Sequence, residues 1–143
     1  MATRSHIGIK NQDNSVTYIY CHWDGYPEHN GMLLCKHWDD VYFVEQLMNL
    51  GNLSCLGSEI GERQNFDQPT DSNWCLAYGR DRGEENVDYR TFSSEQDFLE
   101  NFNGGEEFHY LFKDGKWYYS DYTSEFKPLE IDLIMKLLSK DEA

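Results

Sequence analysis

Basic residues are scarce in this chain of 143 residues: 12 Lys and Arg stand against 26 Asp and Glu, which gives a formal net charge of −14. Because like charges repel, this imbalance argues against direct binding to nucleic acid or to anionic lipid. It suits a soluble acidic surface, a basic protein partner or mimicry of the DNA backbone. The longest acidic runs are pairs such as Asp39-Asp40, Glu84-Glu85 and Glu106-Glu107, which weakens the case for a mimic.

Long apolar runs are also missing. No segment approaches the roughly twenty residues of a membrane span, and the first residues carry no apolar signal region. The four cysteines form no CxxC pair and no dense framework, so we expect reduced, packed thiols in a cytoplasmic protein without membrane contact. The histidines and cysteines of residues 21–37 match no zinc spacing, and we expect no metal.

Glycine-rich phosphate loops are absent as well. The glycines form neither a GxGxxG motif nor a Walker loop, and there is no basic helix suited to reading DNA. These absences exclude the standard dinucleotide, nucleoside triphosphate and DNA-reading motifs, so we expect no cofactor. Aromatic residues, in contrast, make up 15% of the chain, enough to build much of one core and to suit a homo-oligomer interface equally well.

Three segments predict β-hairpins. Residues 3–10 and 16–23 alternate in polarity on either side of a polar turn. Residues 74–80 and 87–92 flank a second polar turn, and Asp114-Gly115 between two aromatic runs is the strongest short-range hairpin signal in the chain. We therefore predict a single α+β domain, residues 1–143, with an antiparallel sheet built from three hairpins and helices packed on at least one face.

Helices are predicted between and after these hairpins. A short helix is expected near residues 30–38, and a second one is capped by Asp39 or Asp40 and ends at Gly51. A third begins with the capping box of Ser93 and Gln96 and ends at Gly104. Residues 52–72 are predicted to form an irregular loop. The last helix is expected to start at Pro128, with an apolar stripe of Ile131, Ile134, Met135 and Leu138.

The segment from Tyr20 to Pro27 places a histidine, an aspartate and aromatic rings around a turn at a strand end, where a sheet presents side chains to ligands. If residue numbers in the first hairpin sum to 26, Arg4 lies opposite His22 and His6 opposite Tyr20, all on one face. A shift by one residue would move His22 and Tyr20 to the other face from Arg4.

Two more arginines follow a later predicted strand. Arginine binds phosphate through two N–H groups and aromatic rings stack on bases, so a small anionic, nucleotide-like ligand fits this set. The predicted ligand-binding residues are Arg4, His22, Trp23, Asp24, Tyr26, Arg80 and Arg82. The alternative is structural: Arg80 and Arg82 pair with Asp24 or Asp81, and Trp23 and Tyr26 belong to the core.

Catalysis has weaker support. Cys21 and His22 alternate across a strand and point to opposite faces, so they cannot act as nucleophile and base. His22 and Asp24 could form a general base, but no nucleophile or paired carboxylate with a local signature accompanies them. The residues favour binding over an enzyme.

Several segments together resemble a known family. They are Thr3-Arg4-Ser5, Tyr20, the HWDGYP run of residues 22–27, Gly31, Leu53-Ser54, Leu56-Gly57, the RDRGE run of residues 80–84, and residues 112–117. The chain is similar in these to a widespread family of small phage and prophage proteins. The resemblance implies a phage accessory protein in the bacterial host cytoplasm, acting in host takeover or counter-defence, with HWDGYP and RDRGE as family hallmarks.

Three functions remain open from the sequence. The first is a binding protein that sequesters a small anionic, nucleotide-like ligand, as the resemblance to phage proteins also favours. The second is an acidic inhibitor, or a DNA mimic, that binds a host protein. The third is a hydrolase or transferase that uses His22 and Asp24.

Overall fold

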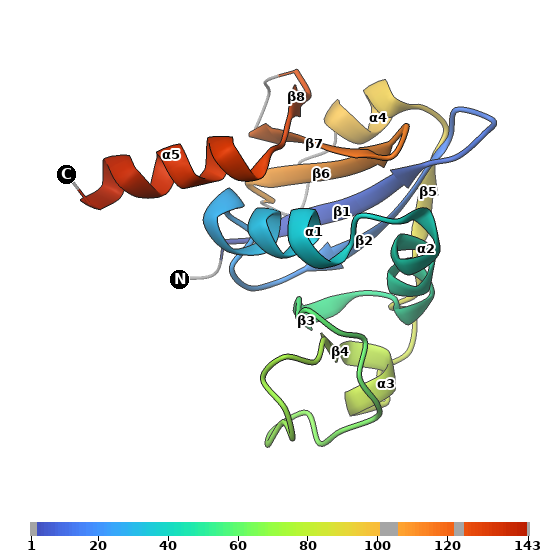
Figure 1. Ribbon diagram of the computed structural model, residues 1–143. Helices are drawn as coiled ribbons and strands as arrows, with labels where there is room; N and C mark the ends of the chain where they lie inside the picture. Colours follow the sequence, from blue (N-terminus) through green and yellow to red (C-terminus); the bar gives the residue numbers. More distant parts are fainter. Residues whose placement is uncertain (1–2, 101–105, 122–124, 143) are drawn as a thin grey trace.

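A single mixed sheet organises the protein (Figure 1). The structure, a computed structural model, describes residues 3–100, 106–121 and 125–142. Within these residues the strands are β1 (Ser5–Lys10), β2 (Val16–Cys21), β3 (Leu53–Cys55), β4 (Leu76–Ala77), β5 (Arg90–Phe92), β6 (Phe108–Lys113), β7 (Lys116–Asp121) and β8 (Lys127–Pro128). They lie in the order β4-β3-β2-β1-β6-β7-β8, and β5 pairs with β2.

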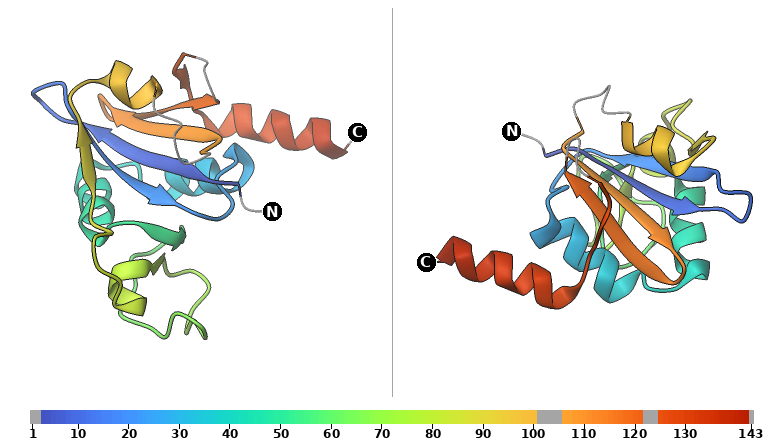
Figure 2. Two further views of the ribbon diagram at one scale, coloured as in Figure 1. Left: turned by 180° about the vertical axis from the view of Figure 1, so that it is seen from behind. Right: turned by 90° about the horizontal axis from the view of Figure 1, so that it is seen from above.

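The helices frame this sheet. They are the π-helical turn η1 (Pro27–Gly31), α1 (Met32–His37), α2 (Val41–Leu50), α3 (Tyr78–Arg82), α4 (Glu95–Glu100) and α5 (Ile131–Glu142). Figure 2 shows α1 and α2 on one face of the sheet and α4 on the other. The α+β class is therefore confirmed, with helices on both faces.

The first and third hairpins are confirmed. In the first, β1 and β2 pair so that residue numbers sum to 26, with Ser5 opposite Cys21 and His6 opposite Tyr20. In the third, β6 and β7 are joined by Asp114 and Gly115, which both adopt the positive φ that this tight turn requires.

The second predicted hairpin is wrong, and the sheet is mixed rather than antiparallel. After only two residues of strand, the chain turns into α3, because the carboxylate of Asp81 accepts a hydrogen bond from the backbone N–H of Ala77 (2.8 Å). Residues 90–92 pair with β2 instead. In addition, β1 pairs with β6 and β2 pairs with β3, both in parallel. These pairings join segments that are distant in the sequence, so the alternation of polar and apolar residues within one strand does not reveal them.

Most helix predictions near the middle of the chain are confirmed. Asp40 caps α2 by accepting from the N–H of Tyr42 (2.8 Å), and Gly51 ends the helix with a φ of 86°. For α4, the residue that accepts from the N–H of Asp97 is Ser94 (3.1 Å) rather than Ser93. The predicted end of that helix at Gly104 lies outside the described residues.

The last helix begins later than predicted. Pro128 lies in β8, beside Tyr118 of β7, and α5 starts at Ile131. Ile134 is buried, whereas Ile131 and Met135 are exposed; the side chain of Leu138 lies outside the described part. No helix among the described residues is both long and apolar enough to cross a membrane.

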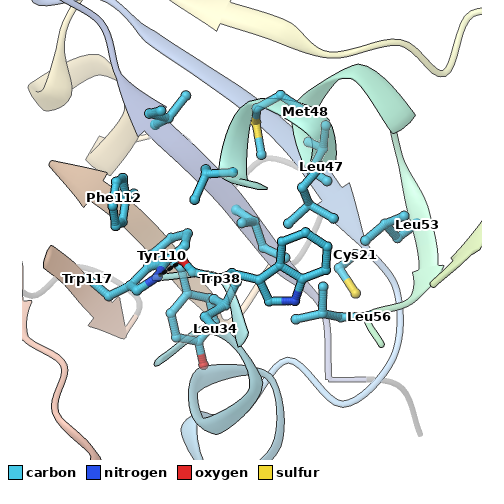
Figure 3. Packing of buried hydrophobic residues seen from close by; sticks show 14 of the residues in the cluster. Cys21, Leu34, Trp38, Leu47, Met48, Leu53, Leu56, Tyr110, Phe112 and Trp117 are labelled. Atoms are coloured by element: carbon cyan, nitrogen blue, oxygen red, sulfur yellow. Dashed lines mark hydrogen bonds between the residues drawn. The ribbon is translucent and has the colours of Figure 1, made fainter. Parts of the chain in front are cut away.

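The main core lies between the sheet and the helices α1 and α2 (Figure 3). Alternate side chains of the central strands, such as Ile7, Ile19 and Tyr110, meet Val44 and Leu47 of α2 there, all fully buried. A smaller cluster of Val16, Phe98 and Leu111 covers the opposite face under α4. The remainder of that second face is left for polar side chains.

Buried ring donors connect these layers. The indole N–H of Trp117 donates to the carbonyl of Trp38 (2.8 Å), and the indole of Trp38 donates to the carbonyl of Gly57 (3.0 Å). The hydroxyl of Tyr110 donates to the carbonyl of Gly25 (2.6 Å). Each aromatic side chain thus contributes apolar area without leaving a buried donor unsatisfied.

Gly25 lies in the turn after β2, packed against the start of β1. Its N–H donates to the carbonyl of Thr3 (2.8 Å). A β-carbon at this position would lie 2.7 Å from that same oxygen and 2.8 Å from Cβ of Ser5. This close approach links the TRS and HWDGYP segments physically.

We expect Gly25→Ala to lower the free energy of unfolding by about 2 kcal/mol, since backbone and side chain must move to admit the methyl group. Gly31→Ala is the matched control, because its new β-carbon meets nothing closer than 3.4 Å and its backbone is helical. Urea unfolding of both variants measures the difference. Equal stability of the two would show that the turn adapts without cost.

Candidate functional site

A polar pocket of about 190 Å³ lies on the face of the sheet opposite α1 and α2. It is built by side chains of β1, β2 and β5, by the segment before β3, and by the segment before β6. Its lining residues are His6, Tyr18, Tyr20, Asn52, Arg90 and Glu106. In the first hairpin His6 of β1 pairs with Tyr20 of β2, so the two side chains lie side by side on this face of the sheet.

His6 and Glu106 line the pocket together, and the fully buried ring of His109 lies behind His6. Nε2 of His6 lies 3.0 Å from Oε1 of Glu106, and its Nδ1 lies 3.3 Å from Nδ1 of His109. Burial, with a smaller contribution from His6, lowers the pKa of His109 to about 3, so this ring is neutral near pH 7. Both nitrogens of His6 are engaged, which leaves it poorly placed to act as a general base.

Tyr20 is hydrogen-bonded to the ring of His22 beside the pocket. Burial raises the pKa of Tyr20 to about 12, so its hydroxyl keeps its proton, and its oxygen lies 2.7 Å from Nδ1 of His22. Burial and the nearby charge of Arg4 lower the pKa of His22, which keeps the ring neutral. The hydrogen bond with Tyr20 occupies Nδ1, so Nε2 is the ring nitrogen of His22 that remains for a ligand.

Asn52 and Arg90 add further donors. Oδ1 of Asn52 accepts from the N–H of Tyr20 (2.9 Å), so its Nδ2 group is left to donate elsewhere. Arg90 is exposed at the edge of the pocket, and within the described residues no ion pair involves it. Burial raises the pKa of Tyr18, and the charge of Arg90 beside it opposes that rise.

The predicted cluster is only partly assembled. The structure brings Arg4 near His22 and Tyr20, and Trp23 stands edge-on to His22 with ring centroids 4.8 Å apart. Trp23 is 42% exposed, so the alternative that placed it in the core is wrong. Tyr26 is half-buried at the turn.

Asp24 does not orient His22. Its carboxylate accepts from the hydroxyl of Tyr26 (3.4 Å), and its φ of 56° shapes the turn. In the part of the chain that the structure describes, no hydrogen bond joins Asp24 to His22, whose Nδ1 is taken by Tyr20. The geometry thus provides no His22–Asp24 dyad.

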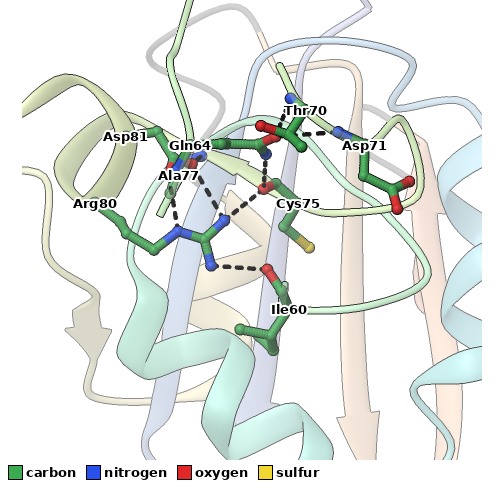
Figure 4. A network of polar contacts seen from close by, with 8 residues as sticks. All are labelled: Ile60, Gln64, Thr70, Asp71, Cys75, Ala77, Arg80 and Asp81. Carbon is green, nitrogen blue, oxygen red and sulfur yellow. Dashed lines mark hydrogen bonds and ion pairs between the residues drawn. The ribbon is translucent and has the colours of Figure 1, made fainter. Parts of the chain in front are cut away.

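Arg80 belongs to a structural network (Figure 4). Its guanidinium donates to the carbonyls of Ile60 and Cys75, both at 2.7 Å, and pairs with Asp81 at 2.9 Å. Asp81 also accepts from the N–H of Gln64 (3.0 Å). These contacts hold the irregular loop against β4 and α3, as the structural alternative for Arg80 and Asp81 predicted.

Arg82 is engaged on the surface of the same helix. Its guanidinium pairs with Glu84 and lies over the rings of Phe66 and Tyr78, at 4.6 and 4.8 Å from their centroids. These contacts account for both arginines of the RDRGE segment without a ligand, and neither Arg80 nor Arg82 lines the pocket.

Sequence reasoning missed Asn52, Arg90 and Glu106. None of them lies in a recognisable motif, and they reach the pocket only through pairings of distant segments, such as Arg90 opposite Tyr18.

Comparison with protein-family models, with curated proteins and with solved structures gives no match for this chain. Among the described residues, no group of three or more His, Cys, Asp or Glu side chains is arranged to hold a metal ion.

We expect Arg80→Ala to lower the free energy of unfolding by about 3 kcal/mol, because it leaves the buried carboxylate of Asp81 without its partner. Arg82→Ala, which breaks an exposed ion pair, should cost about 1 kcal/mol or less. Chemical denaturation of both variants gives the two values. A smaller loss for Arg80→Ala than for Arg82→Ala would contradict the network.

The buried ring of His109 predicts acid sensitivity. The unfolded chain binds a proton there below its ordinary pKa of 6.5, whereas the folded chain does so only near pH 3. Stability is therefore lost as the pH falls through this window, by about 2 kcal/mol between about pH 8 and about pH 5. His109→Gln should show a correspondingly flatter pH dependence of unfolding, while His37→Gln, which changes an exposed histidine, should keep the wild-type slope. Equal slopes in all three proteins would refute the assignment.

Proposed function

We propose that this protein binds a small anionic ligand in the pocket lined by His6, Tyr18, Tyr20, Asn52, Arg90 and Glu106. The observation that carries the proposal is the convergence of donors in a strongly acidic chain. Arg90 offers a guanidinium and Asn52 an amide N–H in one cavity, and the neutral imidazole of His22 lies beside it, next to Tyr20. Hydrogen bonds from such groups to an anion are among the stronger polar contacts in proteins.

The acceptors of the site narrow the ligand class. The carboxyl group of Glu106 lies in the same pocket as Arg90, so a ligand that carries hydroxyl or amino donors beside its anionic group satisfies both. A volume of about 190 Å³ is below the roughly 300–1,000 Å³ of sites for drug-sized ligands. The pocket therefore suits a small anion or the anionic end of a larger molecule.

The exposed ring of Trp23 extends this proposal to nucleotides. It stands beside His22, and aromatic faces next to a phosphate-binding group commonly stack on bases. We infer that the phosphate of a nucleotide-like ligand enters the pocket while its base lies against Trp23. Arg4, which lies close enough to lower the pKa of His22, adds positive charge on the same side.

Binding without turnover is the mode that these contacts favour. His6 is engaged at both nitrogens, Nδ1 of His22 is engaged by Tyr20, and Asp24 is directed elsewhere. Together with the resemblance to small phage proteins, this supports sequestration of a ligand in the bacterial cytoplasm as the accessory function. A hydrolase or transferase centred on His22 and Asp24 has no geometric support.

The test is isothermal titration with AMP, inorganic phosphate and uncharged adenosine, preceded by native mass spectrometry after incubation with bacterial small-molecule extract. We expect AMP to bind more tightly than adenosine, and Arg90→Ala to weaken AMP binding about 10- to 100-fold, which corresponds to one charge-assisted hydrogen bond. Arg63→Ala, which removes an exposed arginine outside the pocket, is the control. Binding that Arg90→Ala leaves unchanged, or no added mass and no heat with any probe, would exclude this pocket.

A further inference from the structure

The first turn of α2 exposes three consecutive apolar side chains. Val41 is 51% exposed, Tyr42 61% and Phe43 45%. The buried face of the same helix is already supplied by Val44, Leu47 and Met48. In a surface helix the remaining positions are normally polar, so neither the core nor the solubility of the protein explains these three, which we call the α2 patch.

A groove adjoins the α2 patch. A cavity of about 350 Å³ lies between the end of α1, the side of α2 and the segment after β3, and Phe43 forms part of its wall together with Trp38 and Ile60. The groove is partly apolar and partly polar, since His37, Gln46, Ser58 and Glu59 also line it. An exposed aromatic group beside such a hollow resembles the anchoring rings of protein interfaces, which have an apolar centre and a polar rim.

Exposed carboxylates surround this centre. Asp39 and Asp40 precede the patch, Glu45 follows it on α2, and Glu59 lines the groove; all four are exposed. Lys36 is the one exposed cation that precedes them on the described stretch of residues 36–45. The rim is therefore negative, like the chain as a whole at −14, and it attracts a surface of the opposite sign.

We propose that the α2 patch docks a basic protein partner, which inserts an aliphatic or aromatic side chain flanked by Lys or Arg into the groove. Two copies of this chain would bring acidic rims together, and nucleic acid or anionic lipid would meet the same repulsion. The proposal is independent of the ligand pocket, because α2 covers the other face of the sheet (Figure 2).

The probe is a displayed library of random 12-residue peptides, selected on the wild-type protein and counter-selected on the double variant Tyr42→Ser/Phe43→Ser. Both rings are exposed, so the variant should keep the wild-type circular dichroism and melting temperature. We expect enriched peptides that carry Lys or Arg around a large apolar residue. Their affinity, measured by fluorescence polarisation, should fall at least about 10-fold in the double variant and about as much between 50 and 300 mM salt.

Two further variants make the test specific. Met135→Ser removes another exposed apolar side chain, on α5 away from α2, and should leave peptide affinity unchanged. Asp39→Asn with Glu45→Gln should reduce the salt dependence. The proposal is overturned if enriched peptides are acidic or bind both proteins equally, if no peptide is enriched, or if sedimentation shows a wild-type dimer that the double variant loses, since the occupant would then be a second copy.

Discussion

The pairing of β1 with β2 is the constraint on which the rest of the molecule depends. Side chains alternate across a strand, so this one register sends Ile7 and Ile19 toward the helices and His6 and Tyr20 toward the opposite face. A slip by one residue would bury the polar set and expose the apolar set. The apolar core and the polar pocket are thus two sides of the same alignment, and neither exists without the other.

The HWDGYP segment combines structural and surface roles in six residues. Gly25 packs against the start of β1, and its carbonyl accepts a hydrogen bond from the hydroxyl of Tyr110. Pro27 is the first residue of the helical turn that follows. His22 and Trp23, by contrast, face outward beside the pocket. A rigid turn of this kind holds two outward side chains in one orientation, which lowers the entropic cost of binding to them.

The sequence predicted contacts between residues that are close in the chain better than contacts between residues that are far apart in it. The Asp114-Gly115 hairpin, the Asp40 cap and the face shared by His6 and Tyr20 follow from local patterns, and all are present. The strand predicted at residues 74–80 failed because one buried carboxylate, that of Asp81, turns the chain into a helix. Arg90 and Glu106 could not be found, since only the completed sheet brings them to the pocket.

The parallel pairing of β1 with β6 also has a consequence for how the protein is made. His6 and His109 are in contact although 103 positions separate them. On a ribosome that adds roughly 5 to 20 residues per second, the amino-terminal hairpin waits about 5 to 20 s with an open edge before its neighbour exists. During that interval the free edge of β1 can pair with other chains, and the later pairing of β6 with β1 covers that edge and brings Glu106 to the pocket.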